Sequence, residues 1–338
     1  MKNPSSKSPY IETLRGIAIL LVVIGHVIGS TSSGGMKVDD SSFYRYLYCF
    51  FENIRMPLLT VISGWVYALH PIEKSKTWLF LRKKVRRLLF PMIFVGSTYY
   101  IIQYLTPGTN MKHSLGDIWQ IYIFPYTFFW YLPALFLVFS SCIPFERLGL
   151  LKTSRNWSIL MAVSYILCFC VVSDIIPQSV QNIFAFKNAL YLLPFFLLGV
   201  GLNKFEKQLA SPIFRKIYLT GTIIGILLQQ IYYFSNGEFT FYAFTHIDIL
   251  IGMISTAFLV YLKLKNPAFI WIAQYAYTIY LFHGFGTSGG RIILAHIGIN
   301  NSFIIFTFAT IIAIASAIIV EKVFINWTIT RKLFLGKK

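Results

Sequence analysis

The chain has 338 residues, of which 56% are hydrophobic and only 12% are charged, and its mean hydropathy is +0.65. Soluble domains average roughly 45–50% apolar and about 25% charged residues. This composition therefore excludes an ordinary soluble globular protein, a disordered chain and a disulfide scaffold. The apolar residues come in runs of about 20, the length that a helix needs to cross roughly 30 Å of hydrocarbon. The sequence predicts an all-α, polytopic integral membrane protein.

The apolar runs predict about ten transmembrane helices in a single transmembrane domain, residues 1–338. The predicted spans are 10–30, 46–69, 84–104, 125–145, 157–174, 187–203, 217–234, 241–262, 268–287 and 302–321. With the N-terminus in the cytoplasm, 23 of the 30 Lys and Arg residues fall in cytoplasmic segments and only five in outer loops. This asymmetry is typical of membrane proteins and predicts that both termini are cytoplasmic. It also accounts for the net charge of +18, so the partner expected from the charge is the lipid bilayer and not nucleic acid.

The first predicted span carries two ionisable side chains, Arg15 and His26. They are eleven residues apart, so in a helix their side chains lie within about 20° of each other around the axis and roughly 16 Å apart along it. Ionisable residues inside a membrane are costly and mark candidate functional sites. One helix face thus offers a cation near the cytoplasmic surface and a titratable base deeper inside. A core histidine bonded to a neighbouring helix, together with an interfacial arginine, is the alternative.

A basic cluster opens the third predicted span in the segment FLRKKVRRLLFP, residues 80–91. Lys84, Arg86 and Arg87 are candidates for holding phosphate groups, as point charges or as bidentate forks. A loop that only sets the membrane orientation is the alternative.

Two further segments place polar groups inside predicted spans. In residues 54–66, Pro57 and Gly64 are typical of a kinked helix, and Arg55 is a cation near the outer end. In residues 277–285, Tyr280 and His283 lie on one helix face, where the alternative role is interhelical hydrogen bonding.

Few acidic or metal-binding groups accompany these residues. Glu52 and Asp248 are near-membrane carboxylates, and either is able to orient a histidine, but the first span itself offers no acid close to His26. No Cys and His set has the spacing of a zinc site, so the sequence predicts no metal and no disulfide.

Together these residues form an ordered series of motifs that resembles acyltransferase family 3, bacterial membrane proteins that O-acetylate cell-surface polysaccharides. The matching residues are Glu12, Leu14, Arg15, Gly16 and His26; Met56-Pro57-Leu58 and Ser63-Gly64-Trp65; Lys84, Arg87 and Pro91; Trp130-Tyr131-Leu132; Pro194-Phe195-Phe196 and Leu198-Gly199; Ile279-Tyr280-Leu281 and His283; and Glu321-Lys322. Arg55 stands where many relatives have His, and Lys84 replaces the commoner first Arg of the basic pair. The resemblance covers nearly the whole chain, in order.

The resemblance implies an acyltransferase that moves an acetyl group from cytoplasmic acetyl-CoA to a hydroxyl of a glycan or its lipid-linked precursor. His26 and Arg15 are then the expected catalytic residues. The expected donor-binding residues are Arg15, Lys84, Arg86 and Arg87, and the expected substrate-binding residues are Arg55, Tyr280 and His283. The implied location is the bacterial cytoplasmic membrane, without a fused extracytoplasmic domain.

Alternatives to this mechanism and function stay open from the sequence. His26 is able to act as a general base or as a nucleophile that carries the acyl group. A glycan or acyl-group transporter is the competing function, because buried cations and kinked helices also suit transport. A membrane assembly protein without turnover is a third possibility.

Overall fold

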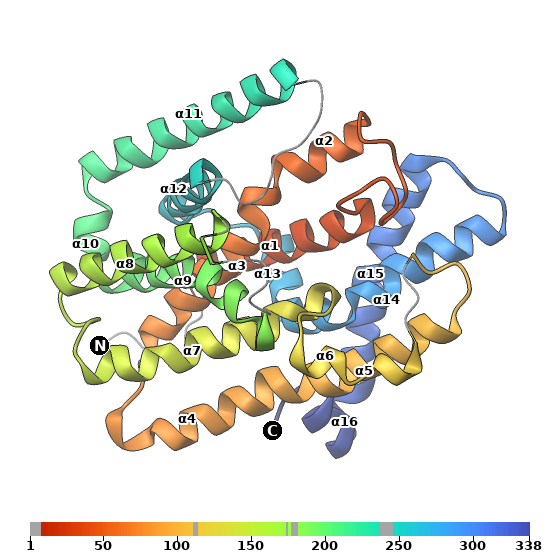
Figure 1. Ribbon diagram of the computed structural model, residues 1–338, viewed down its shortest axis with the longest axis horizontal. Helices are drawn as coiled ribbons and strands as arrows, with labels where there is room; N and C mark the ends of the chain where they lie inside the picture. Colours follow the sequence, from red (N-terminus) through yellow and green to blue (C-terminus); the bar gives the residue numbers. More distant parts are fainter. Residues whose placement is uncertain (1–7, 111–113, 174, 177–181, 237–245) are drawn as a thin grey trace.

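The computed structural model describes residues 8–110, 114–173, 175–176, 182–236 and 246–338, and every regular element in these residues is helical (Figure 1). The α-helices are α1 Pro9–Ile28, α2 Phe43–Phe50, α3 Glu52–Leu69, α4 Thr77–Lys84, α5 Phe90–Leu105, α6 Gln120–Ile123, α7 Tyr131–Arg147, α8 Ser154–Val172, α9 Phe186–Lys204, α10 Glu206–Leu209, α11 Pro212–Asn236, α12 His246–Leu262, α13 Pro267–Gln274, α14 Ala276–His296, α15 Ser302–Phe324 and α16 Thr328–Leu333. Short 3-10 turns cover Lys74–Lys76, Leu115–Asp117, Thr127–Trp130 and Ile183–Ala185, and a π-helix covers Val85–Leu89. The predicted all-α membrane fold is confirmed.

The number of spans differs from the ten predicted. In the described residues, seven helices are long and apolar enough to cross a membrane, or eight if the bent pair α12 and α13 forms one span. Two predicted spans, α3 and α14, are not among them, although both are long helices. Charged and polar side chains lower their hydropathy: α3 contains Glu52 and Arg55, and α14 contains His283 and Arg291. Both helices contribute residues to the cavities described below, Glu52 and Arg55 from α3 and Tyr280 from α14.

Two predicted spans are broken in the structure. The span 46–69 divides at Phe51 into α2 and α3, and the span 268–287 divides at Tyr275 into α13 and α14. A second bend of 115° separates α12 from α13. The apolar pattern continues through each break, so hydropathy alone predicts one helix where the backbone forms two.

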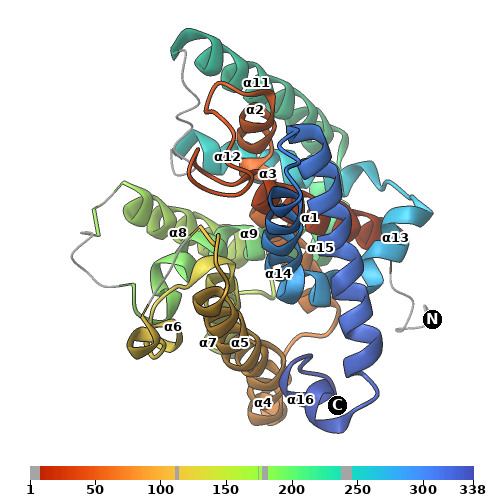
Figure 2. The same ribbon diagram turned by 90° about the vertical axis from the view of Figure 1, so that its right-hand side faces the viewer.

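The first helix, α1, runs through the middle of the bundle in both views (Figures 1 and 2). It packs against α3, α13, α14 and α15. Leu14, Ala18 and Val23 are fully buried in these contacts. Neighbouring helices therefore hold the backbone of α1 in place, and this fixes the starting point of the α1 side chains that line the cavities described below.

Helices α3 and α9 cross at close range through two glycines. A Cβ atom at Gly64 would overlap the carbonyl oxygen of Phe196, and one at Gly199 would overlap the carbonyl oxygen of Val61. Small residues of this kind let two membrane helices approach until their backbones touch. Gly64, expected at a kink, thus has a packing role within the single helix α3, and the motifs Ser63-Gly64-Trp65 and Leu198-Gly199 meet at this crossing.

We expect Gly64→Ala to destabilise the protein by about 1–3 kcal/mol, because the added methyl group meets backbone atoms that have no room to move aside. Thermal denaturation of the purified protein in detergent measures the loss. Gly289→Ala is the matched control, because a Cβ at Gly289 in α14 meets nothing within 4 Å. Equal melting of Gly64→Ala and the wild type would contradict the packing role.

Candidate active site at two cavities

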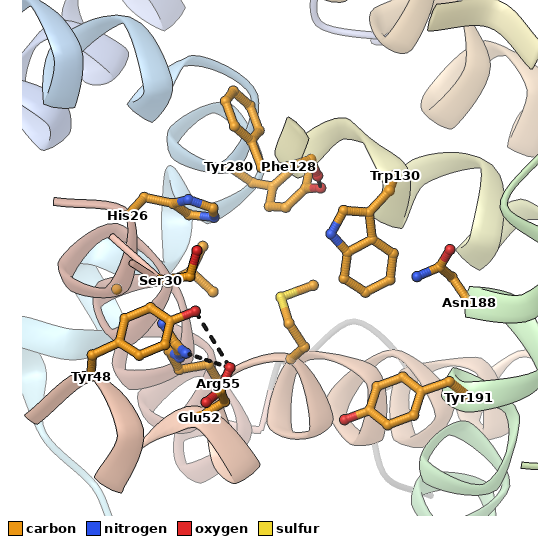
Figure 3. Close-up of a pocket in the computed structure, with 13 residues that line it drawn as sticks. His26, Ser30, Tyr48, Glu52, Arg55, Phe128, Trp130, Asn188, Tyr191 and Tyr280 are labelled. Atoms are coloured by element: carbon orange, nitrogen blue, oxygen red, sulfur yellow. Dashed lines mark hydrogen bonds and ion pairs between the residues drawn. The ribbon is translucent and has the colours of Figure 1, made fainter. Parts of the chain in front are cut away.

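A cavity of about 280 Å³ lies beside the outer half of α1 and is called here the histidine cavity (Figure 3). It is lined by Val22, Gly25, His26, Ser30, Tyr48, Glu52, Arg55, Met56, Phe128, Trp130, Asn188, Tyr191 and Tyr280. These residues come from α1 and the loop after it, from α2, α3, α9 and α14, and from the turn Thr127–Trp130. The cavity thus gathers polar groups from segments far apart in the chain.

His26 projects from α1 into this cavity. Its side chain is exposed, whereas Gly25 and Val27 on either side of it are buried. Its ring lies 5.6 Å from the ring of Phe128 and 4.9 Å from that of His283, measured between centroids. The candidate base therefore contacts two rings and remains accessible from the cavity.

The wall opposite Phe128 is formed by a charged and aromatic group around Arg55 (Figure 3). The Arg55 guanidinium lies 3.9 Å from the Tyr48 ring centre and 3.7 Å from a Glu52 carboxylate oxygen, to which the Tyr48 hydroxyl donates a hydrogen bond of 3.4 Å. A Cβ at Gly25 would overlap the Arg55 guanidinium. The glycine before His26 therefore makes room for the cation, and Arg55 is brought next to the histidine, as a substrate-binding role requires.

A second cavity of about 600 Å³ lies toward the other end of α1 and is called here the basic cavity. Its lining includes the basic residues Arg15, Lys83, Lys84 and Arg87, and also His70. The positive-inside rule predicts that this is the cytoplasmic side of the protein. Arg15 and Ile19 line the basic cavity, and Val22 and His26 line the histidine cavity, so one face of α1 serves both.

The cations of the basic cavity are held by neighbouring side chains. Arg15 donates hydrogen bonds of 2.7 and 2.8 Å to the two carboxylate oxygens of Glu12. The Lys84 ammonium lies 3.2 Å from the centre of the Phe139 ring, and the Arg87 guanidinium lies 4.5 Å from that of Tyr277. A cation is attracted to the face of an aromatic ring, so these contacts fix the positions of Lys84 and Arg87 in the cavity wall.

Lys84 and Arg87 flank the start of a π-helical turn, Val85–Leu89. Two contacts brace this turn: the Tyr277 hydroxyl donates to the Arg87 carbonyl, and Gly336 (φ 59°) packs so closely that a Cβ there would lie 2.6 Å from the Arg86 carbonyl oxygen. Single π-turns inside helices often occur at functional sites. Lys84 and Arg87 line the basic cavity, whereas Arg86, predicted to bind the donor, is not among the residues that line it.

Tyr280 lines both cavities, and no other residue is shared by the two linings. Its hydroxyl donates to the carbonyl of Phe128, and its ring packs 5.6 Å from that of Tyr131. The side chain is almost completely buried. Tyr280 is thus the wall at which the basic cavity and the histidine cavity meet.

His283 lies behind the histidine cavity rather than in its lining. The side chain is fully buried and contacts the rings of His26 and Phe128. The predicted substrate-binding position therefore faces the candidate base and not the open cavity.

Several lining residues were not singled out as site residues from the sequence. Trp130 belongs to a matching motif and Glu52 was noted as a carboxylate, but Tyr48, Asn188 and Tyr191 carry no local signal. Asp248 accepts a 3.0 Å hydrogen bond from Asn53. Within the described ranges, no group of three His, Cys, Asp or Glu side chains is arranged to hold a metal ion.

The comparisons with known proteins agree with the motifs. The model of the family described as the acyltransferase domain, acyltransferase 3, matches residues 8–322, nearly the whole chain. No curated protein and no solved structure matches the chain. The match contains α1 through most of α15, and with them both cavities. The chain belongs to acyltransferase family 3 and is a membrane acyltransferase.

Proposed function

We propose that the protein is a membrane O-acetyltransferase that moves an acetyl group from cytoplasmic acetyl-CoA to a hydroxyl of a cell-surface glycan or its lipid-linked precursor. The observation that carries this proposal is the meeting of a basic cavity and a histidine cavity at one residue, Tyr280. A transferase needs two sites that share a reaction point, one for each substrate. The bacterial cytoplasmic membrane is the proposed location.

The basic cavity is the proposed donor site. CoA carries three phosphate groups, and Lys83, Lys84 and Arg87 present positive charge on the side where CoA is made. Arg15 adds a fourth cation at the base of α1. The pantetheine arm is long, thin and partly apolar, and leucine and aromatic side chains line the way from these cations to Tyr280. In this arrangement the thioester lies near Tyr280 when the phosphates are bound.

The histidine cavity is the proposed acceptor site. Trp130, Tyr191 and Phe128 offer aromatic faces, against which the C–H groups of a sugar ring pack. Asn188 and Ser30 offer hydrogen-bonding groups suited to hydroxyls. Small-molecule sites commonly combine apolar walls with a few placed polar groups in this way.

His26 is the proposed general base at the meeting point. It takes the proton of the acceptor hydroxyl as that oxygen attacks the thioester carbonyl carbon. The carbon–sulfur bond then breaks, and the imidazolium returns the proton to the departing CoA sulfur. The products are an O-acetyl ester and CoA with a free thiol. Transfer through an acyl-His26 intermediate, a double displacement, is the second route. Two-substrate kinetics separate the routes, because only a double displacement gives parallel lines in double-reciprocal plots of the initial rate at several acceptor concentrations.

Membrane vesicles that contain the protein test the proposal when they are given [1-¹⁴C]acetyl-CoA on the cytoplasmic side. The expected result is base-labile label in the glycan or lipid-linked saccharide fraction, with one CoA thiol released for each acetyl group transferred. A transporter moves its cargo without forming an ester. Translocation of saccharide without ester formation would therefore contradict the proposal and favour transport.

A further inference from the structure

We propose that His283 is the positioning residue of His26: its Nε2 atom accepts a hydrogen bond from one ring nitrogen of His26 and leaves the other nitrogen free to act as the base. This inference rests on the proposed function. It fills a gap in the sequence, which offers no acid on α1 near His26.

The first step is the protonation of His283 at Nδ1. That atom lies 2.8 Å from the carbonyl oxygen of Tyr280 and 3.1 Å from that of Ile279. A carbonyl oxygen only accepts hydrogen bonds, so Nδ1 must carry the hydrogen. In a neutral imidazole the other nitrogen, Nε2, is then a pure acceptor. The backbone of α14 thus selects the tautomer.

The second step is that the acceptor atom, Nε2 of His283, lacks a donor. His283 is fully buried, and among the described residues its Nε2 has no hydrogen-bond partner. A buried acceptor left unpaired costs about 1–3 kcal/mol, so the protein gains by supplying a donor.

The third step is the choice of donor among the rings that surround His283. Phe128, at 4.4 Å between centroids, has no polar hydrogen, and the Tyr280 hydroxyl already donates to the Phe128 carbonyl. The remaining ring is His26, at 4.9 Å and tilted by 46°. A neutral His26 has one N–H to give, and it is the donor that fits.

The consequence for the reaction is a fixed orientation of His26. When one His26 nitrogen donates to His283, the lone pair of the other nitrogen faces the histidine cavity, where the acceptor hydroxyl is expected. After His26 takes the proton, its bond to Nε2 becomes charge-assisted and stronger. Of the near-membrane carboxylates, Glu52 pairs with Arg55 and Tyr48, and Asp248 accepts from Asn53.

Two variants of His283 test the inference in the vesicle assay with acetyl-CoA. His283→Leu keeps a side chain of similar volume but removes the acceptor, whereas His283→Gln is able to place an amide oxygen near the position of Nε2. We expect the leucine variant to lose kcat about 100-fold at unchanged KM for acetyl-CoA, because misplacing a reacting group by about 1 Å costs about 100-fold in rate. The glutamine variant should recover kcat to within about tenfold of the wild type.

The outcomes separate the inference from the function on which it rests. Wild-type kcat in His283→Leu, or equal losses in both variants, would overturn the positioning role, because packing alone does not distinguish an acceptor from an apolar group. A wild type that transfers no acetyl would contradict the proposed function and, with it, this inference. If the leucine variant does not fold, ¹⁵N-histidine spectra of the wild type decide: protonated Nε2 on His283 would overturn the proposal.

Discussion

Replacing His26 with glutamine should abolish acetyl transfer while leaving the protein folded and able to bind the donor. The variant keeps a polar side chain at the cavity wall but has no group that takes a proton near neutral pH. General base catalysis contributes about 10²–10⁴-fold, so we expect kcat to fall by at least about 10³-fold when the positioning of the hydroxyl is lost as well. Initial rates of [1-¹⁴C]acetyl transfer at saturating acetyl-CoA measure the change.

Donor binding supplies the internal control for this variant. The basic cavity is lined by Arg15, Lys84 and Arg87 and does not include His26, so the Kd for acetyl-CoA should stay within about twofold of the wild type. A His26→Gln protein that transfers acetyl at the wild-type rate would contradict the assigned role. A variant that lost donor binding together with activity would show that His26 supports the fold or the donor site instead.

The second large effect is expected at the basic cavity, where two adjacent arginines should behave differently. Arg87 lines the cavity and Arg86 does not, although both belong to the same π-turn. Removing one charge-assisted contact to a phosphate costs about 1.5–3 kcal/mol. We therefore expect Arg87→Ala to weaken acetyl-CoA binding by at least about tenfold, and Arg86→Ala to leave it within about twofold. Isothermal titration of each purified variant gives the two constants.

Arg86→Ala is a close control for Arg87→Ala, because both variants lose one positive charge from the same segment. Equal weakening would mean that the cluster acts only through its overall charge or its effect on membrane orientation. A loss confined to Arg86→Ala would place the phosphates elsewhere. Thermal stability must be compared as well, since the Arg86 Nε is buried without a hydrogen-bond partner in the structure.

The sequence predicted the parts of the site that depend on local periodicity. Arg15 and His26 were expected on one helix face from their spacing, and the structure places them on the same side of α1, each in a cavity. The basic segment before α5 was expected to offer cations to a ligand, and Lys84 and Arg87 line the basic cavity. Both predictions needed only the geometry of a single helix.

The rest depends on contacts between segments that the sequence does not connect. The π-turn that contains Arg86 and Arg87 is braced by Tyr277 and by Gly336, each far away along the chain. The shared wall at Tyr280 requires α14 to meet the turn Thr127–Trp130. The burial of His283 behind His26 follows from the packing of α14 against α1. These contacts join residues far apart in the sequence, so neither helical periodicity nor a local motif predicts them.

The count of membrane spans was also limited by what the sequence reports. Hydropathy reports how apolar a segment is, and it passed over the breaks at Phe51 and Tyr275 because apolar residues continue through them. Helices α3 and α14 are less apolar than the seven long helices because they carry charged and polar side chains, Glu52 and Arg55 in α3 and His283 and Arg291 in α14.

The most direct test of the account is the binding of acetyl-CoA, compared with S-acetylpantetheine, to the wild-type protein in lipid nanodiscs. Both molecules carry the same thioester and arm, and only acetyl-CoA carries the nucleotide phosphates. The account predicts saturable binding of acetyl-CoA and binding of S-acetylpantetheine weaker by at least about 10²-fold, since several charge-assisted contacts are lost. Equal affinity for the two, or no binding of acetyl-CoA by well-folded protein, would contradict the assignment of the basic cavity as the donor site.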